Sequence, residues 1–230
     1  MQYFQKSIIA VLATFSLVVM AGCQRGGDST QATASVNGPG GAPGTDPSGA
    51  AATPKSDQDP LHPVVQVDTT LGTFKVRLDM EKAPLTVDNF LNYVANQYYD
   101  QTIFHQVLKE YPSLALGGGY TSDLVEKKPR TPIRNEAHNG LKNHRGTIAM
   151  ARQADAEDSA TSQFFINLSD NEILDFKDRS SQGYGYCVFG NVIEGLDVVQ
   201  RIGQVPVHDA SKLERTPVET IAIKSIRRIK

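Results

Sequence analysis

The sequence lacks several features that would point directly to a function. It contains no tryptophan, only two cysteines and no excess of either charge, since 23 Lys and Arg residues and 25 Asp and Glu residues give a formal net charge of −2. This balance creates no field that would gather nucleic acid or an anionic membrane surface. Cys23 and Cys187 lie in segments of different character, so a stabilising disulfide is not expected.

Three further patterns are interpreted as structural rather than chemical. Gly117-Gly118-Gly119 is followed by no Lys-Ser/Thr pair, which favours a tight loop over a phosphate cradle. Cys187 lies in an apolar strand pattern, which predicts a buried, inert thiol. Four of the five histidines were considered as metal ligands, and they lack metal-ligand spacing, so we expect no metal and no cofactor; they are His105, His138, His144 and His208.

The N-terminus resembles an export signal. Lys6 precedes an apolar run from Ile8 to Met20, and thirteen residues make about 20 Å of helix, short of the roughly 30 Å hydrocarbon core of a membrane. Met20-Ala21-Gly22-Cys23 resembles a lipobox, which implies a lipoprotein signal peptide at residues 1–22 and a lipid on Cys23 as the sole membrane anchor. A plain secretory signal is the alternative. Gln24 favours the outer membrane, facing the periplasm, in a double-membraned bacterium.

The segment after Cys23 is predicted to be a tether. Residues 23–62 are rich in Gly, Ala, Pro, Ser and Thr and cannot bury enough apolar surface to offset the entropy of ordering. The coil of about 37 residues from Gln24 to about Pro60 reaches roughly 30 to 35 Å. Residues 63–230 have the composition of one globular domain, and the chain has no internal repeat.

Hydrophobic periodicity in residues 63–230 predicts a mainly β domain with two helices. Val87, Phe90, Leu91 and Val94 recur at helical spacing behind Thr86, a predicted N-cap, and residues 195–202 repeat the pattern. Seven short apolar runs are typical of strands: residues 64–70, 73–78, 102–107, 146–151, 163–168, 186–192 and 218–229. They favour a closed β-barrel capped by helices, with a two-layer α+β sandwich as the alternative.

Six motifs resemble the cyclophilin family of peptidyl-prolyl isomerases. They occur in order between about Val64 and Ile229: Phe104-His105-Gln106-Val107, Gly117-Gly118-Gly119, Asn135-Glu136-Ala137, Gly146-Thr147-Ile148-Ala149-Met150-Ala151-Arg152, Ser162-Gln163-Phe164-Phe165-Ile166 and Val188-Phe189-Gly190. The resemblance implies a closed eight-stranded antiparallel barrel capped by two α-helices. It also implies catalysed rotation about the bond preceding proline, whose barrier is near 20 kcal/mol, without a covalent step.

The resemblance also implies roles for individual residues. Phe165, Leu174, Tyr186 and Leu114 would line the pocket for the proline ring, with Met150 nearby. Gln163 and the backbone of Ala151-Arg152-Gln153 would bind the peptide main chain. The residues implied for catalysis are Gln106, Phe165 and Gln163, and those implied for substrate binding are His105, Leu114, Leu116, Met150, Ala151, Arg152, Leu174 and Tyr186.

Two positions depart from the family pattern. Gln106 replaces the family's catalytic arginine and lacks its charge and rigid guanidinium fork. Leu116 replaces the glutamine that anchors the substrate. The segment before the glycines is about two residues longer than usual, and Tyr111 within it is a candidate replacement for a missing aromatic residue. Losing one preorganised donor typically costs roughly 10² to 10³ in rate.

Two classes of function therefore stay open. The first is a peptidyl-prolyl isomerase of reduced activity that assists the folding of cell-envelope proteins. The second is a non-catalytic module or chaperone that binds proline-containing segments near the membrane. In both, the partners are proline-containing polypeptides, the membrane is reached only through the lipid, nucleic acid is not bound, and the protein is expected to be a monomer.

Overall fold

The computed structural model describes residues 59–210 and 213–229. The predictions for the signal peptide, for Cys23 and for the tether as far as residue 58 lie outside the described residues. Asp59–His62, the last part of the predicted tether, form a turn in which the Leu61 carbonyl accepts a hydrogen bond from Met80 N–H. Within the described ranges, no helix is long and apolar enough to cross a membrane.

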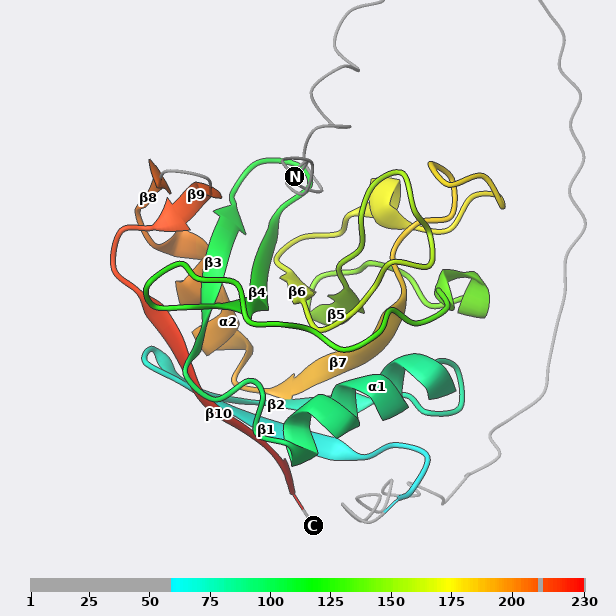
Figure 1. Cartoon of the computed structure of the whole chain (residues 1–230), viewed down its shortest axis with the longest axis horizontal. Coiled ribbons are helices and arrows are strands. Elements are labelled where there is room, and N and C mark those ends of the chain that lie inside the picture. The colour runs from blue at the N-terminus through cyan, green and yellow to red at the C-terminus, as the bar shows by residue number, and fades with distance from the viewer. Residues whose placement is uncertain (1–58, 211–212, 230) are drawn as a thin grey trace, which may run out of the picture.

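Eight strands close into an antiparallel barrel in the order β1-β10-β3-β4-β6-β5-β7-β2 (Figure 1). The predicted fold class is thereby confirmed, and the sandwich alternative is wrong. The barrel strands are β1 (Val64–Thr69), β2 (Gly72–Leu78), β3 (Thr102–Leu108), β4 (Leu114–Thr121), β5 (Thr147–Met150), β6 (Phe164–Asn167), β7 (Val188–Glu194) and β10 (Ile221–Ile229).

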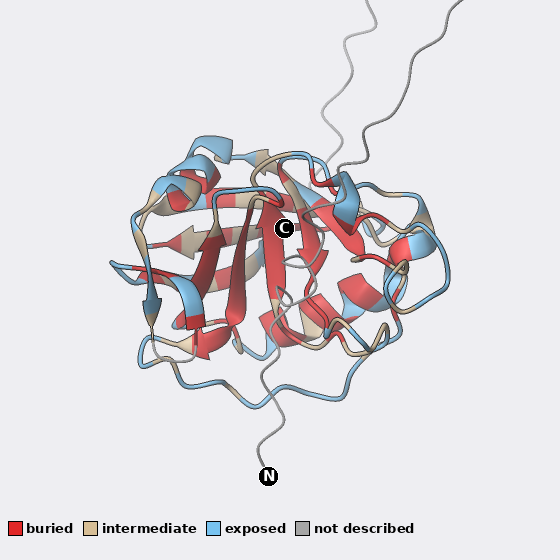
Figure 2. Cartoon of the chain, turned by 90° about the horizontal axis from the view of Figure 1, so that it is seen from above, coloured by how far each residue is buried: buried red, intermediate tan, exposed pale blue. Residues whose placement is uncertain are grey.

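The core fills the barrel interior with apolar side chains from every strand and both helices. Strand β2 shows the pattern clearly, because Phe74, Val76 and Leu78 are buried and alternate with less buried residues. Helix α1 (Pro84–Ala95) adds Phe90, whose ring contacts those of Tyr99, Phe164 and Phe189. Figure 2 shows the buried strands surrounded by exposed loops and helix faces.

Helix α1 starts differently from the prediction. Its N-cap is Ala83, with Pro84 in the first turn, so the prediction of Thr86 as the N-cap is wrong. The Glu136 carboxylate performs the capping instead, because it accepts hydrogen bonds from Leu85 N–H, Thr86 N–H and the Thr86 hydroxyl at 3.2, 2.8 and 2.7 Å. The cap therefore comes from a residue fifty positions away.

Strand β4 corrects the interpretation of the three glycines, which lie inside this strand rather than in a loop. Gly118 has φ +82°, and a Cβ there would lie 2.8 Å from the Phe164 ring, so glycine is needed for both conformation and space. The β3–β4 pairing is irregular at two places, which accommodates this backbone.

Five elements complete the fold. Helix α2 (Leu196–Gln204) buries Val198, Val199 and Ile202 in the main core. The 3₁₀ turns η1 (Ala137–Asn139) and η2 (Glu172–Leu174) lie in long loops. Strands β8 (Val207–Ala210) and β9 (Leu213–Pro217) form a separate hairpin that packs on β3.

Candidate functional site

A lateral row of residues crosses five strands on one face of the barrel wall. Gln106 on β3 lies directly opposite Leu116 on β4, and Leu116 lies opposite Phe165 on β6. Phe165 in turn lies opposite Ala149 on β5, which pairs with Val188 on β7. Directly opposed residues of neighbouring strands project to the same face. The row therefore brings Gln106 beside an apolar surface centred on Phe165.

That surface is an apolar cluster separate from the main core. Phe165 is 1% exposed, and its ring meets that of Tyr186 edge-on at 5.7 Å. The cluster consists of Leu114, Leu116, Ala149, Ala151, Phe165, Leu174 and Val188, with Leu108, Leu141 and Tyr186 packed against it. The structure thus brings together the residues implied for the proline-ring pocket, with the exception of Met150.

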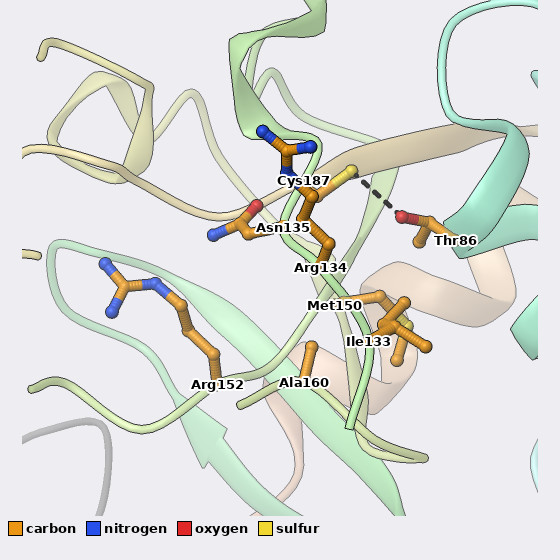
Figure 3. A pocket seen from close by; sticks show the side chains of 8 residues that line it. All are labelled: Thr86, Ile133, Arg134, Asn135, Met150, Arg152, Ala160 and Cys187. Carbon is orange, nitrogen blue, oxygen red and sulfur yellow. Dashed lines mark hydrogen bonds between the residues drawn. The ribbon is translucent and has the colours of Figure 1, made fainter. Parts of the chain in front are cut away.

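Met150 lies in the main core instead. It is 1% exposed and belongs to the interior cluster of the barrel. Figure 3 shows it with Ile133, Ala160 and Cys187, which line the same small pocket. Its place follows from strand alternation, because Ala149 and Ala151 on either side of it point to the ring cluster.

Gln106 is nearly buried, with 5% exposure. Its side-chain Nε2 donates a hydrogen bond to the backbone carbonyl of Glu214 on β9 at 3.1 Å. One of the two N–H donors of this carboxamide is therefore engaged by the hairpin. Leu116, directly opposite, offers no polar atom to a bound peptide.

His105 points away from the ring cluster. Its ring packs on Tyr120 at 4.5 Å between centroids, and it is 2% exposed. Burial lowers its pKa from 6.5 to about 3, although a hydrogen bond with the Ile103 backbone opposes the shift. The imidazole is therefore neutral at pH 7. Its Nδ1 finds no hydrogen-bond partner among the described residues.

Gln163 lies on the surface beside the row. Its Nε2 donates to Glu126 Oε1 at 3.5 Å. Its side chain covers Gly119, where an added Cβ would lie 2.5 Å from Gln163 Cγ. The side chain is partly exposed.

Arg152 is a buried structural cation, 6% exposed. Its guanidinium donates to the carbonyls of Gly185, Gln153, Ala154 and Ser181 at 2.8, 2.8, 3.0 and 2.9 Å. It also lies 4.9 Å from the centre of the Tyr186 ring. Its donors hold two loops together and keep Tyr186 beside Phe165.

The longer segment between β3 and β4 carries Tyr111. The Tyr111 side chain is exposed, and its hydroxyl oxygen accepts a hydrogen bond from Ile173 N–H on η2 at 3.1 Å. Ile173 is also exposed, whereas its neighbour Leu174 is buried in the ring cluster. The loop between β3 and β4 is therefore hydrogen-bonded to η2, which contributes Leu174 to one side, or wall, of the ring cluster.

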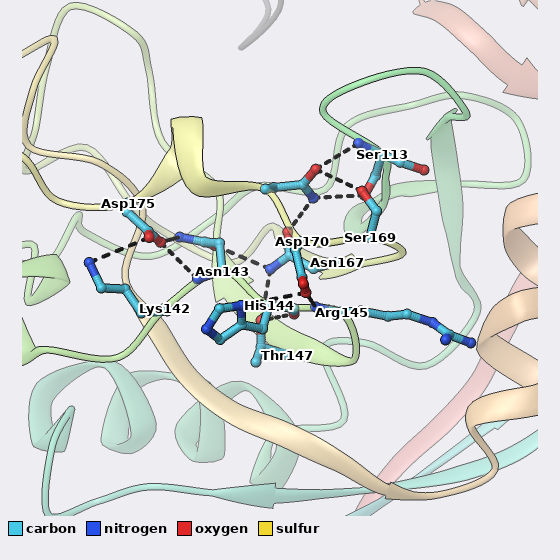
Figure 4. Close-up of polar contacts among 11 residues, drawn as sticks. Ser113, Lys142, Asn143, His144, Arg145, Thr147, Asn167, Ser169, Asp170 and Asp175 are labelled. Atoms are coloured by element: carbon cyan, nitrogen blue, oxygen red, sulfur yellow. Dashed lines mark hydrogen bonds and ion pairs between the residues drawn. The ribbon is translucent and has the colours of Figure 1, made fainter. Parts of the chain in front are cut away.

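Sequence reasoning missed a buried network of asparagines behind the cluster (Figure 4). Asn143 donates to the Leu174 carbonyl and to Asp175 Oδ1, both at 3.1 Å. Asn167 donates to Asn143 Oδ1 at 3.2 Å and to the Thr147 hydroxyl at 2.8 Å. The only signal in the sequence is the unusual placement of Asn143, Asn167 and Asn171 beside apolar runs.

Cys187 is buried, as predicted, at 4% exposure. Burial raises its pKa to about 12, so the thiolate needed for nucleophilic chemistry is not populated near pH 7. The Thr86 hydroxyl lies 3.4 Å from its sulfur. Within residues 59–210 and 213–229, no group of three or more His, Cys, Asp or Glu side chains is placed to hold a metal.

Comparisons with known proteins all point to one family. Residues 64–228 match the family model described as cyclophilin type peptidyl-prolyl cis-trans isomerase/CLD. Peptidyl-prolyl cis-trans isomerase B of Escherichia coli is 44% identical over 163 residues, covering 71% of this chain and 98% of the relative. Peptidyl-prolyl cis-trans isomerase A of Dickeya dadantii is 43% identical over 166 residues, covering 72% and 84%.

Solved structures give the same fold. The cyclophilin type peptidyl-prolyl cis-trans isomerase of Cryptosporidium parvum superposes with a TM-score of 0.59 at 25% identity, covering 74% of this chain and 98% of that one. The same protein in the presence of the dipeptide Ala-Pro gives a TM-score of 0.58, covering 73% and 99%.

Proposed function

The chain belongs to the cyclophilin family of peptidyl-prolyl cis-trans isomerases, and from this membership we propose a membrane-tethered isomerase of reduced turnover that assists the folding of cell-envelope proteins. The enzyme class itself rests on the family match and on curated relatives more than 40% identical. Cyclophilins bind proline-containing peptides. What we propose beyond this is a reduced rate of isomerisation and a location at the cell envelope.

The reaction needs a site that favours a twisted amide. Conjugation across the bond before proline is lost in that state, and the prolyl nitrogen regains a lone pair that accepts a hydrogen bond. The Phe165 cluster supplies an apolar surface for the proline ring. Gln106 is the donor that the lateral row places beside this surface.

The main observation that supports reduced turnover is the hydrogen bond from Gln106 to the Glu214 carbonyl. A neutral carboxamide already bonded within the protein has one remaining N–H for the prolyl nitrogen. Leu116 supplies no second polar contact. Stabilisation of the twisted amide therefore depends on one neutral donor, where a guanidinium would offer several charged ones.

The membrane tether is proposed from the sequence at residues 1–62. The short apolar run and Met20-Ala21-Gly22-Cys23 support lipidation of Cys23, and Gln24 supports an outer-membrane destination facing the periplasm. Mass spectrometry of the mature protein tests this: a diacyl- or triacyl-modified Cys23 is expected at the N-terminus. An unmodified mature N-terminus contradicts the tether.

A coupled assay on a blocked Ala-Ala-Pro-Phe peptide tests the catalytic proposal. We expect the purified protein to accelerate cis-to-trans conversion measurably, with kcat/KM about 10² to 10³ below that of Escherichia coli isomerase B measured in parallel. A rate equal to that of the relative contradicts the reduced turnover. Gln106→Leu, which removes the donor but keeps an uncharged side chain of similar reach, should abolish most of the remaining activity.

The second candidate is a binding module without turnover. It is favoured specifically by Leu116 and by the hydrogen bond that already engages Gln106, which leave the apolar cluster intact but weaken the polar part of the site. NMR titration with the same peptide separates the two: saturable shifts without cis–trans exchange cross-peaks establish binding alone.

A further inference from the structure

Asn171 is the most completely bonded side chain behind the ring cluster. It is fully buried. Its Oδ1 accepts from Ser113 N–H at 2.9 Å and from the Ser169 hydroxyl at 3.1 Å. Its Nδ2 donates to the Ser113 carbonyl at 2.8 Å and to Asn167 Oδ1 at 2.7 Å. Both donors and both acceptor positions of the carboxamide are used.

Two of these four bonds clamp a single residue. The Asn171 carboxamide binds the N–H and the C=O of Ser113 together, as a neighbouring strand would. Ser113 immediately precedes Leu114, the first residue of β4 and a member of the ring cluster. These two bonds, which we call the clamp, therefore fix the backbone position of Ser113 and with it the start of β4 at Leu114.

Asn171 also fixes the other side of the ring cluster, which is formed by Leu174. The Asn171 carbonyl accepts from Leu174 N–H at 2.9 Å, and Asn171 N–H donates to the Asn143 carbonyl at 2.8 Å. The Leu174 carbonyl in turn accepts from Tyr186 N–H at 2.9 Å. Asn171 is thus bonded to both walls of the cluster, to Ser113 before Leu114 and to Leu174 itself.

Tyr111 makes a second tie between the same two elements. Its hydroxyl oxygen accepts from Ile173 N–H at 3.1 Å, next to Leu174 in sequence. Tyr111 is 61% exposed, so its ring adds little to the core, and removing its hydroxyl leaves the barrel packing unchanged. Asn171 and Tyr111 tie the β3–β4 segment to η2 from the buried and the exposed side.

We propose that Asn171, assisted by Tyr111, is a positioning residue that holds the Leu114 and Leu174 walls at the separation that accepts a proline ring. This inference rests on the proposed function, because it assigns the ring to the Phe165 cluster. Neither residue touches the amide that rotates, so the clamp acts on peptide affinity and leaves the rotation step to Gln106.

The expected effect follows from the population of the binding-competent state. The apparent Kd equals the intrinsic Kd divided by the fraction of molecules whose walls are correctly placed. If loss of the clamp lowers that fraction to about one tenth, Kd rises about tenfold. The rotation rate within the bound complex is unchanged, since the complex itself has the same geometry.

The experiment measures Kd and the cis–trans exchange rate at saturation separately, by NMR on the full-length protein with the Ala-Ala-Pro-Phe peptide. Asn171→Ala should raise Kd about tenfold and change the saturated rate less than twofold. Tyr111→Phe, which removes one exposed hydroxyl, should raise Kd two- to threefold, because it lowers the fraction of binding-competent molecules less than Asn171→Ala does. Ser169→Ala is the matched control, because it removes one bond to Asn171 but leaves both bonds to Ser113, and it should leave Kd unchanged.

Each outcome has a distinct meaning. Equal Kd values for the wild type, Asn171→Ala and Tyr111→Phe overturn the positioning role while leaving the proposed function intact. A fall in the saturated rate with unchanged Kd also overturns it. If Asn171→Ala does not fold, Tyr111→Phe decides alone, and an unchanged Kd in that variant refutes the inference. A wild type that binds no proline peptide refutes the proposed function first and this inference with it.

Discussion

Replacing Gln106 by arginine is the sharpest test of the catalytic reasoning. In the present site one N–H of the Gln106 carboxamide is bonded to the Glu214 carbonyl at 3.1 Å, which leaves one neutral donor. Arginine has five donors, so it can keep the bond to the β9 carbonyl and still direct others to the row beside Phe165. The substitution therefore adds a charged donor without requiring the hairpin to move.

The size of the effect follows from hydrogen-bond strengths. A neutral bond contributes about 1 kcal/mol and a bond from a charged group about 1.5 to 3 kcal/mol. The gain of roughly 1.4 kcal/mol in the twisted state corresponds to about tenfold in kcat/KM. Leu116→Gln, directly opposite, adds one neutral bond, so the double variant should gain about a further fivefold.

The coupled peptide assay measures these changes. Gln106→Lys is the matched control, because it supplies the charge without the planar fork, and its rate should lie between those of the wild type and Gln106→Arg. Urea unfolding of each variant checks that the side chain, which is only 5% exposed in the wild type, is tolerated. A folded Gln106→Arg variant with an unchanged kcat/KM would refute the assignment of this position as the donor.

Three further predictions concern stability and reactivity. Glu136→Gln removes the charge that caps α1, and thermal unfolding should show a loss of about 1 to 2 kcal/mol, whereas the exposed Glu172→Gln control should show none. Hydrogen bonding to Arg227 lowers the pKa of Asp100 below its ordinary 3.8, so the pair stabilises the folded state fully above about pH 4 and progressively less as the pH falls further. In urea titrations, Asp100→Asn should cost under about 1 kcal/mol at pH 7 and less as the pH falls below 4. In a Cys23→Ser background, Cys187 should fail to react with a thiol reagent at pH 8 until urea unfolds the domain, because burial raises its pKa to about 12; native-state reaction within seconds would contradict this.

Most of the barrel was predictable because its signals are local. Strands such as β2 alternate buried and solvent-facing residues, and that period is visible in the sequence. Strand β4 was missed because its three glycines have no side chains to alternate, although Gly118 is required by φ +82° and by the Phe164 ring. The β8–β9 hairpin was missed because its residues are mostly charged or half-exposed.

The polar part of the site was less predictable, since it depends on contacts between distant residues. The sequence indicated that Gln106 departs from the family pattern, but its partner, the Glu214 carbonyl, lies 108 positions away. The Asn171 clamp on Ser113 joins residues 58 positions apart. The prediction for Arg152 concerned its backbone, and the sequence did not show that its guanidinium donates to four backbone carbonyls.

His105 allows a last prediction, on acid stability. Its folded pKa is about 3 and its unfolded value about 6.5, because burial disfavours the charged ring. Between these values the unfolded state binds more protons, so stability is full above about pH 6.5 and falls on acidification by up to about 1.4 kcal/mol per pH unit. The free energy of unfolding from urea titrations should therefore drop by about 2 kcal/mol from pH 6.5 to pH 5. His105→Leu should remove most of this drop; an unchanged slope in that variant would assign the acid sensitivity to another group.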